Sequence, residues 1–132
     1  MEFGISTQIH RSRSVTVDLL ESIRKAGYDR IELFANRPHL DFHNRTLLRS
    51  IGRWFTQNGL AAPSLHLPFI EHAGPLEKIW ISVLEPERRL REAAMDEIKR
   101  ALELADHVLL SYVVMHLGNP KAYGRLLLNL LS

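Results

Sequence analysis

Two histidines in this sequence each stand at the end of a short strand-like run, where an imidazole can bind a metal ion or hydrogen-bond to sugar hydroxyls. His66 lies near the end of the run 61–67, which Pro68 stops because proline cannot donate to a sheet ladder. His116 closes the apolar run 112–116, shortly before a glycine. Ligands of parallel α/β proteins bind outside the carboxyl ends of the strands. We therefore expect both imidazoles to share one pocket, although a single histidine at such a place is more often structural.

An acid and a third histidine are further candidates for this pocket. Glu32 lies in the strand-like run 29–34, and an acid at the carboxyl end of a barrel strand is commonly functional. It could instead cap a neighbouring loop. His10 follows the first predicted strand and is expected to face the pocket mouth. The remaining histidines are expected to be exposed in loops, except for a structural His107; the loop histidines are His39, His43 and His72.

Composition restricts the class of protein. The chain has 132 residues, of which 45% are hydrophobic and 24% charged, so it is long enough for one globular domain. Its 17 basic and 15 acidic residues are interspersed along the sequence, which argues against nucleic acid as a partner. There is no cysteine, so a metal would need His, Asp or Glu ligands. No apolar run approaches the roughly 20 residues that span a bilayer, and we expect no membrane partner and a cytoplasmic location.

The order of predicted elements is strand then helix, repeated four times. Strands are expected at 3–9, 29–34, 61–67 and 112–116, and helices at 15–26, 44–58, 87–105 and 121–131. Gly27 and Gly59 stand where the first two helices should end. The long connection 68–86 is expected to pack as a short helix or lid over 76–84.

This alternation predicts parallel strands joined by right-handed crossover helices. The pattern alone leaves an open doubly wound sheet and a closed barrel as alternatives. However, no glycine-rich G-x-G-x-x-G turn follows the first strand, where the sequence reads TQIH. The barrel is therefore favoured.

Three stretches carry a resemblance to a known family. They are GYDRIELF at 27–34, SLHLPF at 64–69, and the helix 91–105 leading into VVMHLG at 113–118. In this order the chain resembles the xylose isomerase-like TIM barrel superfamily, which includes sugar-phosphate isomerases and epimerases and the endonuclease IV type of DNA-repair enzyme. The resemblance implies a (β/α)8 barrel of about 250 residues. Residues 1–132 would then be a single domain, the amino-terminal half of such a barrel, with about four βα units.

The activity implied is isomerisation or epimerisation of a sugar or sugar phosphate, with a divalent metal (Mn, Mg, Co or Zn) in the complete barrel. The resemblance implies that Glu32, His66 and His116 bind or orient substrate, and that His66 and His116 hold the metal. The catalytic base would lie on later strands, so no catalytic residue is assigned and this chain alone could be inactive. A truncated reading frame is one explanation.

Two alternatives remain open. An endonuclease IV-like metal-dependent DNA phosphodiesterase would use the same two histidines but would need a basic surface. A non-catalytic half-barrel would instead have two unpaired sheet edges, which are templates for association. The partner expected in that case is a second copy or a complementary half-barrel.

Overall fold

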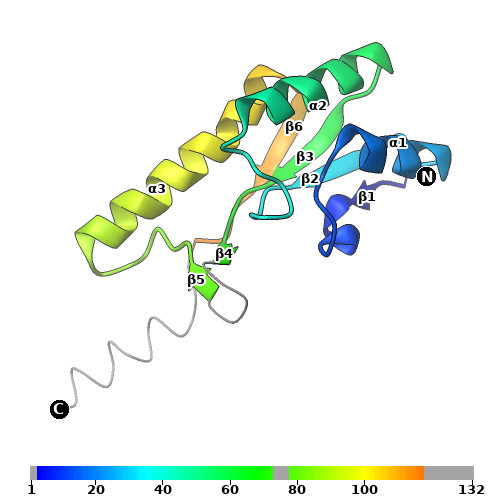
Figure 1. Ribbon diagram of the computed structural model, residues 1–132. Helices are drawn as coiled ribbons and strands as arrows, with labels where there is room; N and C mark the ends of the chain where they lie inside the picture. Colours follow the sequence, from blue (N-terminus) through cyan, green and yellow to red (C-terminus); the bar gives the residue numbers. More distant parts are fainter. Residues whose placement is uncertain (1–2, 73–77, 118–132) are drawn as a thin grey trace.

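The computed structural model describes residues 3–72 and 78–117, and within these the side chains of 3–69 and 81–117 (Figure 1). The helices are α1 (Val17–Lys25), α2 (Arg45–Gln57) and α3 (Arg88–Leu102), with two 3-10 turns, η1 (Thr7–His10) and η2 (Glu103–Asp106). The strands are β1 (Ile5–Ser6), β2 (Ile31–Phe34), β3 (Ala62–His66), β4 (Ile70–His72), β5 (Lys78–Trp80) and β6 (Leu110–Val114).

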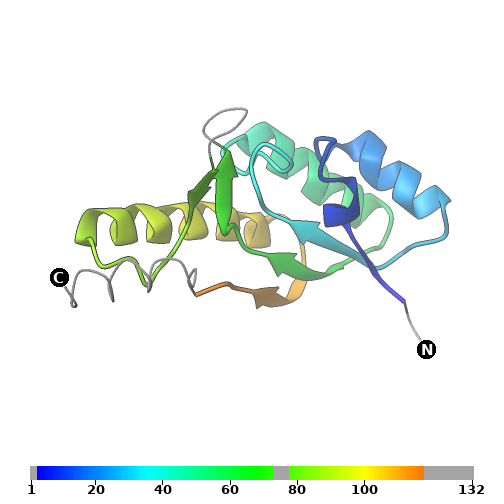
Figure 2. The ribbon, with the colours of Figure 1, turned by 90° about the horizontal axis from the view of Figure 1, so that it is seen from below.

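Four of these strands form one parallel sheet in the order β1-β2-β3-β6. Because each new strand joins the same advancing edge, right-handed crossovers place every helix on one side of the sheet. Figure 2 shows this arrangement, with α1, α2 and α3 above the strands. A doubly wound sheet reverses its strand order and has helices on both faces. The predicted α/β class is confirmed, as parallel βα units arranged in the manner of a partial barrel.

Local sequence signals explain where the first two helices begin and end. The side chains of Thr16 and Asn44 accept hydrogen bonds from the amides of Leu19 and Leu47, and so cap α1 and α2. After these helices Gly27 and Gly59 have φ angles of 97° and 63°, which glycine adopts without a steric penalty.

The core fills the space between the helices and one face of the sheet. Ile31 and Leu33 of β2, and Leu65 of β3, are fully buried there. The helices contribute residues at the spacing of one helical face. These are Leu19, Leu20 and Ile23 of α1, Leu48, Ile51 and Phe55 of α2, and Ala94, Ile98 and Ala101 of α3.

Several predicted boundaries were wrong. The first strand is only two residues long, because Ser6 caps a 3-10 turn by accepting from the amide of Gln8, and His10 therefore lies in η1. The predicted lid at 76–84 contains strand β5, which pairs antiparallel with β4, rather than a helix. Strand β6 begins and ends two residues earlier than expected, and the predicted helix 121–131 lies outside the described residues.

None of the helices among the described residues has the length and apolar character needed to cross a bilayer.

Candidate functional site

The face of the sheet turned away from the helices carries the predicted site residues. Side chains alternate between the two faces of a strand, so Glu32 and Phe34 point opposite to the core residues of β2. The register pairs Phe34 with His66 and His66 with Val114, which makes a row across three strands. One step earlier along the strands, Ser64 is paired with Tyr112 and lies beside Glu32. These two rows correspond to the layered interior of a barrel.

His66 and His116 come together near the carboxyl ends of β3 and β6. Their Nε2 atoms are 2.9 Å apart, whereas their ring centroids are 5.0 Å apart, and the ring planes differ by 17°. In a face-to-face stack, the closest atoms of the two rings would be about as far apart as the two ring centroids. The two imidazoles therefore meet edge to edge, and one Nε2–H donates to the lone pair of the other Nε2. His116 lies two residues beyond the end of β6, so it is not within the strand.

The environment of His66 favours a neutral ring. Partial burial lowers the pKa of His66 below its ordinary value, and the nearby His116 lowers it further, whereas the carboxylate of Glu32 acts in the opposite direction. A neutral His66 can offer a lone pair at Nε2 or donate a proton from it.

Glu32 is held by a single strong contact. The hydroxyl of Ser64, which is 2% exposed, donates to Oε2 of Glu32 at 2.5 Å. Glu32 is the second residue of β2 and not its last, so it lies two residues before the strand end at which the acid was expected. Its charge still acts on His66, which places the carboxylate beside the histidine pair.

Two phenylalanines form apolar walls around the pair. Phe34 contacts the edge of His66 at a centroid distance of 5.1 Å, and Phe69 lies 5.6 Å from His66 and 4.5 Å from His116. The amide of Phe69 donates to Oδ1 of Asn36, which ties the segment after β3 to the end of β2. Sequence reasoning missed both phenylalanines, although Phe69 directly follows the Leu-Pro pair after His66.

The third predicted histidine is not part of this cluster. His10 in η1 lies near His39, on whose pKa its charge acts, and no contact between His10 and the His66–His116 pair is found in the described part of the chain. The chain turns into η1 directly after a very short β1, so His10 follows the first strand within a 3-10 turn, and its place at the pocket mouth stays a prediction.

His39 was expected to be an exposed loop residue but is only 4% exposed. Its Nδ1 atom bonds to the carbonyl of Arg13 at 2.5 Å, and burial lowers its pKa. His43 pairs through Nε2 with Glu97 of α3 at 2.8 Å, which joins the loop before α2 to α3. The side chain of His72 lies outside those described.

The residues at the site fit a metal ion only in part. Cis ligands on an octahedral or tetrahedral ion with bonds of about 2.1 Å lie about 3.0 to 3.4 Å apart, close to the separation of the two Nε2 atoms. However, no group of three or more His, Asp or Glu side chains that could hold a metal is found among the described residues. Within the described residues the pair would supply two ligands to a metal ion.

Comparison of the chain with protein-family models, with curated proteins and with solved structures gave no match.

Proposed function

We propose that His66, His116 and Glu32 form part of the substrate site of a sugar or sugar-phosphate isomerase or epimerase. The observation that carries this proposal is the convergence of the two Nε2 atoms at the carboxyl ends of neighbouring parallel strands. Such sugars are interconverted either by moving a proton beside a carbonyl group or by a metal-assisted hydride shift, and the imidazole pair favours the first route. An imidazole can accept a proton at one ring nitrogen and donate one from the other, so the pair offers both an acceptor and a donor beside a substrate.

The surroundings of the pair suit a sugar. Phe34 and Phe69 offer apolar ring surface, while Glu32 and the imidazoles offer acceptors and donors for hydroxyl groups. A divalent ion, bound by the two Nε2 atoms with additional ligands from a complementary half-barrel, would polarise the substrate oxygens. We also propose that the chain is related to the xylose isomerase-like superfamily and that it is located in the cytoplasm.

The test is proton exchange at the carbon beside the carbonyl group. The chain is incubated in D2O with Mn²⁺ or Co²⁺ and a panel of aldoses, ketoses and their phosphates, and deuterium incorporation is followed by proton NMR. We expect incorporation with at least one sugar, and its loss in His66→Gln and His116→Gln. A matched control is His43→Gln, which removes an imidazole that pairs with Glu97 away from the site.

The metal is tested separately through the visible absorption of Co²⁺. Binding to the chain is expected to weaken in both His66→Gln and His116→Gln and to be unchanged in His43→Gln. No deuterium incorporation with any sugar, combined with Co²⁺ binding that does not depend on the pair, would refute the proposed function.

A second candidate is a non-catalytic half-barrel that associates with a second copy or a complementary half. In the described residues β6 pairs only with β3 and β1 only with β2, so both outer strands keep an unpaired edge. Tyr112 and Leu117 are each 59% exposed, and Val113 is 45% exposed. Concentration-dependent association in light scattering that is reduced by Val113→Lys would support this candidate. A stable monomer at all concentrations would contradict it.

A further inference from the structure

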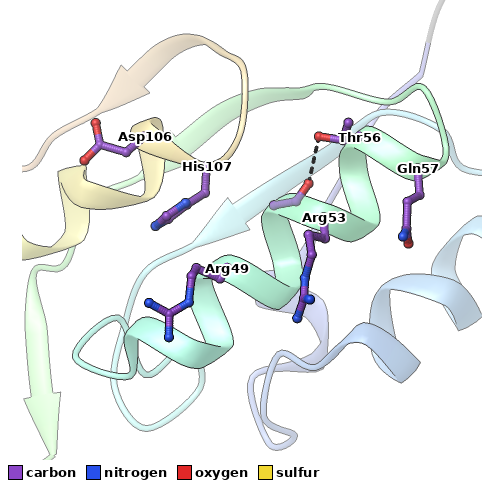
Figure 3. Close-up of a pocket in the computed structure, with 7 residues that line it drawn as sticks. Arg49, Arg53, Thr56, Gln57, Asp106 and His107 are labelled. Atoms are coloured by element: carbon purple, nitrogen blue, oxygen red, sulfur yellow. Dashed lines mark hydrogen bonds between the residues drawn. The ribbon is translucent and has the colours of Figure 1, made fainter.

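A concave region lies on the helical side of the molecule, between α2 and the turn that follows η2. It encloses about 420 Å³, within the range of small-ligand sites. Figure 3 shows the side chains around it. The residues that matter for its chemistry are Arg49, Gly52, Arg53 and Thr56 of α2, together with Asp106 and His107.

The charge of this groove is mainly positive. Arg49 and Arg53 stand one helical turn apart, and their guanidinium groups donate only to hydroxyls, those of Thr46 at 3.2 Å and Ser50 at 3.5 Å. No carboxylate pairs with either arginine within the described part of the chain. The neighbouring acid Glu103 is paired instead with Arg45, at 3.5 Å.

His107 and Asp106 face different directions. Figure 3 shows the imidazole of His107 directed toward α2, while the carboxylate of Asp106 points away from both guanidinium groups. The close approach depends on Gly52, because a Cβ at this position would lie 2.6 Å from the carbonyl oxygen of His107. The backbone of His107 therefore packs directly against α2. This contact brings the imidazole of His107 into the groove that Arg49 and Arg53 also line.

We propose that this groove binds the phosphate group of a small phosphorylated molecule, with Arg49 and Arg53 as the charged donors and His107 as a third donor. Guanidinium groups match the geometry of phosphate oxygens and form charge-assisted hydrogen bonds. The carboxyl-terminal end of α2 carries a partial negative charge, so the backbone does not assist binding here. Affinity must therefore depend on the two arginines.

This groove is separate from the histidine pair. Gln57 ends α2 just before β3 begins, and His107 precedes β6, so the groove lies toward the amino ends of these strands. His66 and His116 lie at their carboxyl ends. The proposal therefore stands or falls independently of the proposed isomerase function.

The experiment is an NMR titration of the full 132-residue chain at low salt with inorganic phosphate and, separately, with phenyl phosphate. We expect saturable shifts of the amides of Gly52, Thr56 and His107. The variant Arg49→Gln/Arg53→Gln should bind about tenfold more weakly or worse. The matched control Arg88→Gln/Arg89→Gln removes the same charge from exposed positions of α3 and should bind as the unmodified chain does.

The two probes separate the sources of phosphate. Equal affinities would show that the groove recognises the phosphate group alone, and tighter binding of phenyl phosphate would show that it also holds the organic part; both support the proposal. Circular dichroism confirms that each variant is folded. Absence of saturable shifts with both probes, or equal weakening in the α3 control, would overturn the proposal.

Discussion

The variant Gly52→Ala tests how closely α2 packs against the turn after η2. An alanine Cβ at position 52 would lie 2.6 Å from the carbonyl oxygen of His107 and 2.7 Å from its Cβ. Real Cβ atoms do not come this close to other heavy atoms. Because both contacted atoms belong to the backbone or are attached to it, no side-chain rotation relieves the clash. Helix α2 and the 107 turn must therefore move apart.

Two opposing effects set the magnitude. Alanine stabilises a helix interior by about 1 kcal/mol relative to glycine. Overpacking of a well-packed interior costs about 1–3 kcal/mol, and a backbone contact lies at the upper end of that range. We expect a net decrease of about 1–2 kcal/mol in the free energy of unfolding.

Urea denaturation followed by circular dichroism measures this decrease. Gln57→Ala, at an exposed position of the same helix, serves as control and should change the stability by less than about 0.5 kcal/mol. If Gly52→Ala were as stable as the unmodified chain or more stable, the helix propensity would outweigh the contact. That result would refute the close packing of α2 against the backbone of His107.

Three further predictions concern ionisable groups. Ser64→Ala removes the hydroxyl that donates to Glu32, and a charged acceptor in a partly buried place then loses its partner. We expect the free energy of unfolding, measured by urea denaturation, to fall by about 1–3 kcal/mol. An unchanged urea midpoint would contradict this. Because the pKa of His66 is lowered in the folded chain, the unfolded chain binds a proton at this imidazole at a higher pH than the folded chain does. The contribution of His66 to stability should therefore be complete above a pH of about 6.5 and be lost as the pH falls through the folded pKa. The fall should be shallower in His66→Gln, and an equally steep fall would argue against this cause. Bonding to Arg24 lowers the pKa of Glu21 to about 2, so an NMR titration of the Glu21 carboxyl should show a clearly higher pKa in Arg24→Gln; no change would contradict it.

Much of the fold follows from local sequence. The spacing of apolar residues predicts α1, α2 and α3, and the caps at Thr16 and Asn44 locate the start of two of them. The alternation of strands and helices predicts the parallel sheet, because consecutive parallel strands require a crossover. These features depend on neighbours within a few residues, which a sequence displays directly.

The sequence by itself determined that His66 and His116 would each lie at the carboxyl end of a strand, and the structure places both there on neighbouring strands, with His116 slightly beyond β6. Only the tertiary structure decided that their Nε2 atoms meet edge to edge, that Ser64 holds Glu32, and that His39 is buried while His10 lies in η1. The physical reason is that contacts across strands depend on register and on where each strand ends. Strand β1 has two residues instead of the expected seven, so His10 lies in a 3-10 turn, and no local pattern specifies that length.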